Sequence, residues 1–243
     1  MKTYGLIGRN ISYSFSRAFF SKKFQHENID AEYVNFDLQS IDQIHNVLKE
    51  TPTLSGLNVT IPYKEDIIPF LSSLDPIAKE IGAVNTVKIE KNGSLTGYNT
   101  DYFGFQESLK PHLQEHHKKA LILGTGGASK AIAYTLKNLN ISYTLVSRDP
   151  ASDQLSYKQL DKQIMEENLL IINCTPLGTH PNITNYPPIS VEFLTADHLI
   201  YDLIYNPSIT QLMKLGLNAE AKVINGEKML QLQAEKAWEI WNR

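Results

Sequence analysis

Short apolar runs alternate with stretches of helical periodicity along almost the whole chain, and this alternation constrains the fold more than any other feature. The run at 119–124 is typical of a buried strand. Those at 169–173 and 199–203 are apolar enough for central strands of a parallel sheet. Strands that alternate with helices predict βαβ units and parallel sheets, so we expect an α/β fold.

The pattern of strands and helices restarts after the region 100–118, which predicts two α/β domains. The first comprises residues 1–101, and we expect the closing helix at 227–243 to fold back onto it. The second comprises residues 102–226. A length of 243 residues is sufficient for two domains, each with a core of its own.

The remaining elements follow from periodicity and from turn residues. Strands are expected at 4–8, 31–38, 54–61, 143–147 and 221–225, with a hairpin at 83–99 around Lys91-Asn92-Gly93. Helices are expected at 16–28, with Ser16 as its cap, and at 41–50, 64–71, 76–82, 124–139 and 208–217. Another is expected from about Thr100, ending at Pro111, and the polar stretch 149–168 is assigned no element.

Composition and charge exclude several classes of protein. The net charge of −3 argues against a nucleic-acid binder, and no apolar run approaches the roughly 20 residues of a membrane helix. Cys174 is the only cysteine, which excludes an internal disulfide framework and fits a reducing compartment. The opening "MKTYGLIG" is too short and strand-like for a signal peptide. We expect a soluble, cytoplasmic protein, either a monomer or a homodimer.

A glycine turn, Gly124-Thr125-Gly126-Gly127, follows one of the strands and opens a helix. In this context the first glycine permits a tight turn, and the second lets the backbone approach a pyrophosphate at the helix N-terminus. Ser129 stands where a third glycine is usual, so the fingerprint is a variant. The turn predicts a Rossmann-like dinucleotide-binding domain, and a purely structural glycine turn is the alternative.

The choice of dinucleotide depends on the residues that end the next strand, which should meet the adenosine ribose. Ser147 stands where an acidic residue would favour NAD, and Arg148 can pair with a 2′-phosphate. These residues favour NADP. Asp149 leaves NAD open, because it is either a turn residue before Pro150 or a ribose ligand.

The stretch "NVTIPYK", residues 58–64, has the form of a strand end that carries a working side chain. Pro62 stops the strand because proline has no N–H to donate, and Lys64 follows two residues later. Enzymes often place reactive groups at such strand ends. By spacing alone, however, Lys64 would be interpreted as a solvated lysine at the start of a helix.

Together the motifs resemble those of the shikimate dehydrogenase family along the whole chain. They are "NISYSFS" (10–16), "NVTIPYK" (58–64), "GAVNTV" (82–87), "GYNTDYFG" (97–104), "GTGGASKA" (124–131), "NCTPLG" (173–178), "YDLIYNPSIT" (201–210) and "MLQLQAEKA" (229–237). The chain departs from the family pattern at Asn10 and Tyr13 in the serine loop, at Ser147-Arg148-Asp149, and at Lys228.

The resemblance implies reversible reduction of 3-dehydroshikimate to shikimate by NADPH, a step of aromatic amino acid (chorismate) biosynthesis. It implies that Lys64 is the catalytic acid/base and that Asp101 is its partner. The two would share the substrate hydroxyl as a coupled pair. Taken alone, Asp101 would be read as a helix cap or a first-turn acid.

The resemblance also implies the remaining ligands. It makes the first domain the substrate domain and the second the NADP domain. Substrate-binding residues would be Ser14, Ser16, Thr60, Asn85, Tyr205 and Gln233. Cofactor-binding residues would be Gly124, Gly126, Gly127, Ala128, Ser147, Arg148, Thr175 and Gly226. Gln233 lies in the apolar stripe of the closing helix, where a core hydrogen bond would serve as well as a ligand.

Other features carry no chemistry in this interpretation. His112 and His116 have a metal-ligand spacing but lie in a polar run without a third ligand, so we predict solvated histidines and no metal site. Cys174, Trp238 and Trp241 are expected to pack in the core.

Two rival functions stay open. One is a quinate/shikimate dehydrogenase that uses NAD, which Asp149 would favour. The other is a ligand-sensing protein on the same scaffold, whose mark would be loss of Lys64 or Asp101. Both residues are present.

Overall fold

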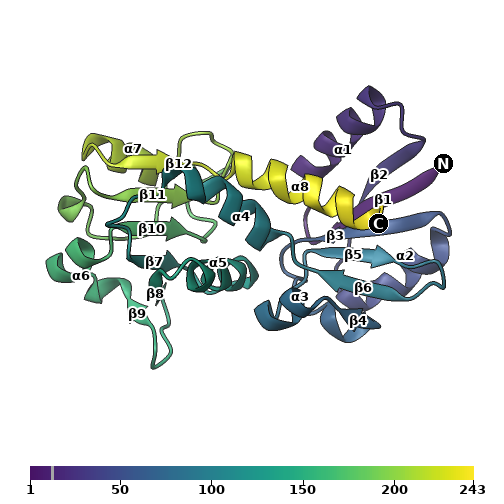
Figure 1. Ribbon diagram of the computed structural model, residues 1–243, viewed down its shortest axis with the longest axis horizontal. Helices are drawn as coiled ribbons and strands as arrows, with labels where there is room; N and C mark the ends of the chain where they lie inside the picture. The colour runs from purple at the N-terminus through teal and green to yellow at the C-terminus, as the bar shows by residue number, and fades with distance from the viewer. Residues whose placement is uncertain (12–13) are drawn as a thin grey trace. The chain divides into compact units, whose positions relative to one another are not determined.

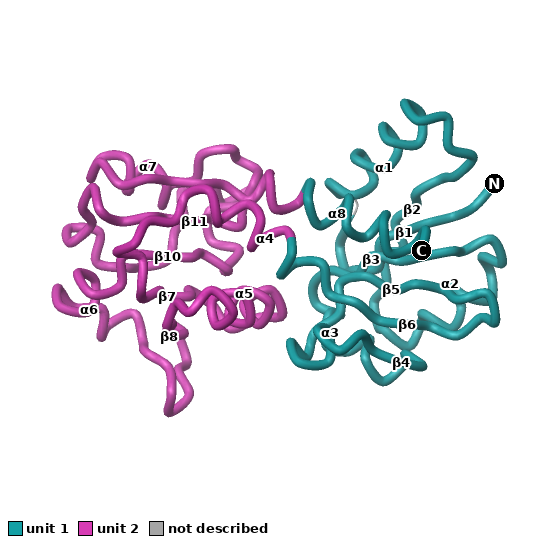
Figure 2. Tube along the Cα trace, in the orientation of Figure 1, with its two compact units in different colours: residues 1–103, 231–243 teal, residues 104–230 magenta. Residues whose placement is uncertain are grey.

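The computed structural model describes residues 1–11 and 14–243, which divide into two compact units (Figure 2). The first unit comprises Met1–Phe103 and Gln231–Arg243, and the second comprises Gly104–Leu230. The boundaries expected from the sequence were 101/102 and 226/227. Two of the helices labelled in Figure 1, α4 (Asp101–Leu109) and α8 (Glu227–Trp241), contain residues of both units, which Figure 2 colours separately.

The strands of the first unit form a mixed sheet in the order β2-β1-β3-β5-β6-β4. Their bounds are β1 (Lys2–Gly8), β2 (Ala31–Asp37), β3 (Leu54–Val59), β4 (Ser73–Leu74), β5 (Thr86–Ile89) and β6 (Leu95–Tyr98). β1 pairs in parallel with β2 and β3, whereas β5 pairs antiparallel with β3 and β6. The hairpin expected around Asn92-Gly93 is therefore present, and it makes this sheet mixed rather than parallel.

The helices of the first unit differ from the sequence expectations at two points. They are α1 (Phe15–His26), α2 (Ile44–Glu50) and α3 (Pro76–Ile81). The predicted cap Ser16 is wrong, because Ser14 has the extended backbone of a cap and its hydroxyl accepts the Arg17 N–H. The helix expected at 64–71 is wrong as well. It is reduced to a 3₁₀ turn at Ile68–Phe70, because Pro69 has no N–H for an α-helical bond.

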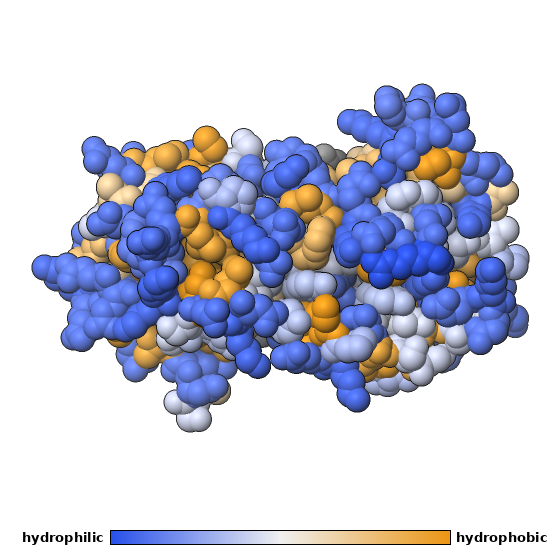
Figure 3. All heavy atoms as spheres, viewed as in Figure 1, coloured by the Kyte–Doolittle hydropathy of each residue, from blue (hydrophilic) through white to orange (hydrophobic). Residues whose placement is uncertain are grey.

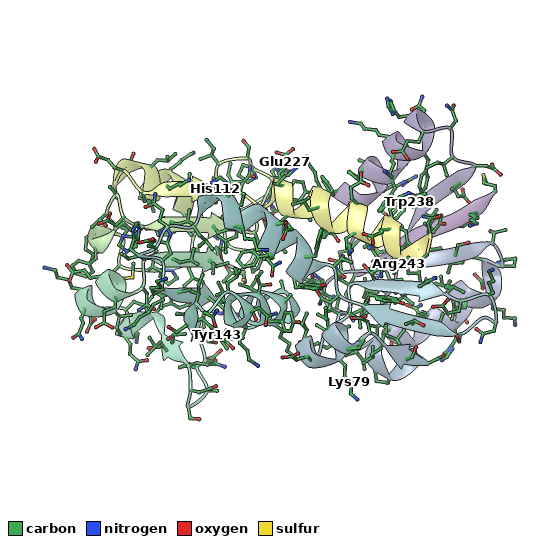
Figure 4. All side chains as sticks on the ribbon, in the orientation of Figure 1. Lys79, His112, Tyr143, Glu227, Trp238 and Arg243 are labelled. Carbon is green, nitrogen blue, oxygen red and sulfur yellow. The ribbon has the colours of Figure 1, made fainter. Side chains whose placement is uncertain are left out.

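Each face of the first sheet carries its own apolar core. On one face, α1 and the second part of α8 pack against β1 and β2 through Phe20, Phe24, Ala234 and Trp241. Trp238 belongs to the same aromatic cluster and projects from α8 (Figure 4). On the other face, α2 and α3 pack against β1, β3, β5 and β6. The sheet is thus covered on both sides, so its polar side chains can gather at strand ends.

The second unit contains a parallel sheet in the order β12-β11-β10-β7-β8-β9. The strands are β7 (Lys119–Leu123), β8 (Ser142–Ser147), β9 (Leu155–Ser156), β10 (Leu170–Asn173), β11 (Leu199–Asp202) and β12 (Lys222–Ile224). From β7 the chain moves outward to β8 and β9, then returns to β10 on the other side of β7. This is the topological switch point at which doubly wound sheets bind nucleotides.

Helices cover both faces of the second sheet. α4, α5 (Gly127–Asn138) and the first turn of α8 pack on one face, and α6 (Lys162–Glu167) and α7 (Gln211–Asn218) pack on the other. Short 3₁₀ turns lie at Ile41–Gln43 in the first unit and at Lys110–His112, Tyr157–Gln159 and Val191–Phe193 in the second. The sequence analysis assigned no element to 149–168, where β9 and α6 occur. Met165 is the buried residue of α6, so this helix shows no apolar stripe.

Hydrophilic side chains cover much of the face seen in Figure 3. Within the described part of the chain, no helix combines the length and the apolar character needed to span a membrane.

Candidate active site

Lys64 and Asp101 form an ion pair in the first unit, with Lys64 Nζ 2.7 Å from Asp101 Oδ2. Lys64 follows β3, and its carbonyl oxygen accepts the Val84 N–H at 2.7 Å. The two side chains are 14% and 8% exposed. Charges this well buried need further hydrogen bonds to offset lost hydration, so the partners of the pair matter as much as the pair itself.

The second oxygen of Asp101 is held by an amide. Asp101 Oδ1 accepts from Asn85 Nδ2 at 2.9 Å. The Asn99 side chain accepts the N–H groups of Asp101 and Tyr102, at 3.0 and 3.3 Å. Because Asn99 performs this capping at the start of α4, the Asp101 carboxylate is left for Lys64 and Asn85.

Asn85 also connects the pair to Thr100 and Gln233. Its Nδ2 lies 3.3 Å from Gln233 Oε1, and its Oδ1 accepts the Thr100 N–H at 2.7 Å. The Thr100 hydroxyl donates to Gln233 Oε1 at 3.3 Å. Gln233 is only 6% exposed. Three predicted site residues, Asn85, Asp101 and Gln233, are therefore brought together with Lys64 in one polar network.

The network contains residues that the sequence analysis did not name. Thr100 is one, and Thr86 donates from its hydroxyl to Asn85 Oδ1 at 3.1 Å. Asn58 Nδ2 donates to Thr86 Oγ1 at 3.3 Å. All three lie inside the quoted motifs "GYNTDYFG", "GAVNTV" and "NVTIPYK", so the motifs contained a signal for them.

Three other predicted substrate residues lie at or near the carboxyl ends of β1 and β3 or at the start of α1. Thr60 follows β3 and donates its N–H to Ile7 O at 2.8 Å. Ser14 caps α1, and the hydroxyl of Ser16 hydrogen-bonds to Tyr33. All three predicted residues are half-buried. Tyr13 of the serine loop lies outside the described residues, and the predicted ligand Tyr205 belongs to the second unit.

The glycine turn of the second unit leaves its backbone open. Gly124 has φ +101°, which favours glycine, and Gly126 precedes the first residue of α5. A methyl group on Gly126 would meet no atom within 4 Å, so a ligand could approach the backbone there. Gly127 and Ala128 form the first turn of α5, whose N–H groups and dipole suit a phosphate. These residues fit a dinucleotide.

Predicted cofactor residues gather at the carboxyl edge of neighbouring strands. A methyl group built on Gly124 would lie 3.1 Å from Thr175 Cγ2, so the loops after β7 and β10 touch. Thr175 is fixed by its own hydroxyl, which donates to Asn173 Oδ1 at 2.7 Å. Arg148 is exposed after β8. The Oγ of Ser147 accepts the Asp149 N–H at 3.2 Å, so this serine shapes the turn.

Gly226 contacts the backbone of Leu203 and Ile204 and none of the other predicted cofactor residues named above. Its N–H donates to Ile204 O at 3.0 Å, and an added methyl carbon would lie 2.0 Å from Leu203 O. Backbone packing therefore explains the glycine, and its cofactor role stays a prediction.

Of the two histidines expected to be solvated, His116 is exposed and His112 is partly buried. His116 Nε2 lies 3.2 Å from Asp197 O, and burial lowers the pKa of His112. In residues 1–11 and 14–243, no group of three His, Cys, Asp or Glu side chains could hold a metal ion. Cys174 is partly buried against the core of the second unit.

Comparison with known proteins matches residues 6–87 to the model of the shikimate dehydrogenase substrate binding domain. A shikimate dehydrogenase (NADP(+)) of Clostridium botulinum (strain Hall) is 41% identical over 252 residues, covering 99% of this chain and 96% of the relative. The chain belongs to the shikimate dehydrogenase family. The family resemblance inferred from the motifs is thereby confirmed.

Solved shikimate dehydrogenases share the fold. Shikimate dehydrogenase 1 from Peptoclostridium difficile is 36% identical with a TM-score of 0.86, covering 100% of this chain and 92% of that one. The Thermus thermophilus enzyme, solved in complex with NADP(H) and shikimate, is 28% identical with a TM-score of 0.87, covering 99% and 93%. The predicted α/β fold with a Rossmann-like domain is confirmed.

A stability test in this shikimate dehydrogenase family member separates packing from ligand binding at two glycines. We expect Gly226→Ala to lower the free energy of unfolding by about 1–3 kcal/mol, because its methyl group would collide with the Leu203 carbonyl. Gly126→Ala is the matched control, since it has open space and a φ of −77°. Urea denaturation of both variants measures the difference, and equal stabilities would contradict the packing role of Gly226.

Proposed function

We propose that this protein is an NADP-dependent shikimate dehydrogenase that reversibly reduces 3-dehydroshikimate to shikimate in aromatic amino acid (chorismate) biosynthesis. The observation that carries the proposal is the largely buried Lys64–Asp101 pair, held at 2.7 Å with Asn85 on the second carboxylate oxygen. Family membership supports the same reaction. A ligand sensor would not need this ion pair.

Lys64 and Asp101 handle the proton in this proposal. The Lys64 ammonium donates a proton to the ketone oxygen of the substrate and stabilises the negative charge that develops there. Asp101 holds the ammonium in place, and in the reverse direction the pair accepts the hydroxyl proton as a unit. NADPH, when bound, supplies the hydride, so the protein's task is to orient the substrate and to move the proton.

The remaining polar groups of the first unit bind and orient the substrate. Ser14 and Ser16 hold its carboxylate, and Thr60, Asn85 and Gln233 contact its ring hydroxyls. Support for Asn85 and Gln233 comes from their place in the network around Asp101. Tyr205 of the second unit is the further substrate ligand.

The second unit holds NADP in this proposal. Gly124, Gly126, Gly127 and Ala128 present the N-terminus of α5 to the pyrophosphate, and the open space at Gly126 supports this. Thr175 lines the same edge of the sheet, and Gly226 is the remaining contact. Ser147 and Arg148 hold the 2′-phosphate of the adenosine ribose. The first unit is accordingly the substrate domain and the second the NADP domain.

Removing the guanidinium of Arg148 should change the choice of cofactor. We expect Arg148→Ala to raise the KM for NADP by about tenfold or more and to change the KM for NAD little. The reason is that charge-assisted hydrogen bonds to a phosphate contribute about 1.5–3 kcal/mol.

Asp149→Ala is the control, and it should leave the preference for NADP unchanged or strengthen it. Steady-state kinetics with both cofactors measure these changes. If NAD is preferred and Asp149→Ala abolishes its use, Asp149 is the ribose ligand instead.

The proposed function is tested by assaying purified protein with shikimate and with quinate, each with NADP and with NAD. We expect the highest kcat/KM with shikimate and NADP. Comparable turnover of quinate with NAD would support a quinate/shikimate dehydrogenase. Binding of shikimate without turnover of any pair would identify a sensor.

A further inference from the structure

The buried hydroxyl of Tyr33 links two parts of the substrate site. Tyr33 lies in β2 and is 4% exposed. Its hydroxyl donates to Asn58 Oδ1 at 2.7 Å and also hydrogen-bonds to the side chain of Ser16. Burial raises the pKa of Tyr33, so the hydroxyl keeps its proton at neutral pH and remains a donor to Asn58.

From Asn58 the hydrogen bonds continue to Asp101. Asn58 Nδ2 donates to Thr86 Oγ1 at 3.3 Å, and the Thr86 hydroxyl donates to Asn85 Oδ1 at 3.1 Å. Asn85 Nδ2 then donates to Asp101 Oδ1 at 2.9 Å. Each group is a donor to the next. Two neighbours orient the Asn58 amide: Tyr33 donates to its oxygen, and Asn85 O, which can only accept, lies 3.4 Å from its nitrogen.

We propose that Tyr33 is a positioning residue of the substrate site, which orients the Ser16 hydroxyl directly and the Asp101 carboxylate through Asn58, Thr86 and Asn85. The inference rests on the proposed function, since it assigns Ser16 to the substrate carboxylate and Asp101 to the proton. Tyr33 itself contacts neither substrate nor cofactor in this proposal. Its hydroxyl thereby fixes the positions of the Ser16 hydroxyl and the Asp101 carboxylate relative to each other.

A neighbouring tyrosine shows that packing alone does not account for the hydroxyl of Tyr33. Tyr4 pairs with Tyr33 in register across β1 and β2, and both rings belong to the same aromatic core. Tyr4 is also fully buried, yet its hydroxyl has no hydrogen-bond partner among the described residues. The two tyrosines therefore differ in the bonds of their hydroxyl groups, which makes Tyr4→Phe a matched control for Tyr33→Phe.

The test compares Tyr33→Phe with Tyr4→Phe. We expect Tyr33→Phe to raise the Kd for shikimate, measured by calorimetry, about tenfold, as for loss of one oriented hydrogen bond, and to lower kcat several-fold. The Kd for NADP should not change. Tyr4→Phe should leave all three quantities within twofold of wild type. If Tyr33→Phe lowers only the Tm and leaves the Kd and kcat within twofold of wild type, the tyrosine is a packing residue and the inference is wrong.

A second variant breaks the same path away from Tyr33 and keeps the inference testable if Tyr33→Phe does not fold. Thr86→Val preserves shape but removes the hydroxyl between Asn58 and Asn85, and we expect it to lower kcat several-fold. In the double variant Tyr33→Phe/Thr86→Val, kcat should be no lower than in Thr86→Val alone. If the fold-losses of kcat in the two single variants multiply in the double variant, the two residues do not act through a shared path. An unchanged kcat in Thr86→Val would overturn the path to Asp101. If wild-type protein does not bind shikimate, the proposed function fails, which is distinct from any of these results.

Discussion

Lys64→Ala is expected to lower kcat by about 10²–10⁴-fold, because it removes the group that donates the proton and stabilises the developing alkoxide. Binding of shikimate should change much less, since the ring hydroxyls and the carboxylate have other partners. The loss should therefore appear in kcat and in kcat/KM together. Steady-state kinetics with shikimate and NADP, at saturating concentrations of each, measure this change.

Lys79 provides the matched control for Lys64. It lies on α3 of the same unit, is exposed, and projects away from the helix (Figure 4). Lys79→Ala should leave kcat and KM within twofold of wild type. The proposed role of Lys64 would be wrong if Lys64→Ala changed kcat less than about tenfold while raising KM sharply, because that pattern belongs to a residue used in binding only.

Asp101→Asn should also cause a large loss of kcat, of about 10²-fold or more, although the side chain keeps its size. The substitution removes the negative charge that lies 2.7 Å from Lys64 Nζ, so the lysine loses the partner that orients it. The pH–rate profile should change as well, because the proton is no longer shared within a pair. Measuring kcat across the pH range tests both expectations.

Asp75 is the control for this substitution. Its carboxylate caps α3 by accepting the Ile77 N–H at 3.0 Å, and asparagine caps helices equally well. Asp75→Asn should therefore keep the kcat and the pH–rate profile of wild type. Normal turnover and an unchanged profile in Asp101→Asn would reduce Asp101 to a first-turn acid of α4.

Local sequence determined those elements whose cause is local. The apolar runs at 119–124, 169–173 and 199–203 became β7, β10 and β11, because strands of a parallel sheet that is covered on both faces are apolar along most of their length. Asn92-Gly93 formed the hairpin turn between β5 and β6, and Gly124-Thr125-Gly126-Gly127 formed the turn into α5. In each case the conformational limits of a few adjacent residues are sufficient to specify the structure.

Local patterns failed where neighbours or proline overrode them. The apolar spacing at 64–71 predicted a helix, but Pro69 prevents one. The cap of α1 depended on which serine has an extended backbone, and that serine is Ser14. α6 has too few buried apolar positions to be visible in the sequence. The mixed character of the first sheet came from β5 entering antiparallel beside β3, a pairing between strands that are separated by β4 and α3.

The sequence by itself determined the family, the order of strands and helices along most of the chain and the residue types of the candidate site, because motifs and periodicity are local properties. Only the tertiary structure decided which side chains meet. The Lys64–Asp101 pair joins residues 37 positions apart, and the Asn85–Gln233 bond joins residues 148 apart. The hydrogen bond from Tyr33 to Asn58 could likewise not be predicted from the motifs. Such contacts arise because strands pair and because the second part of α8 packs on the first unit. Buried polar groups then form hydrogen bonds with the groups that this packing places beside them.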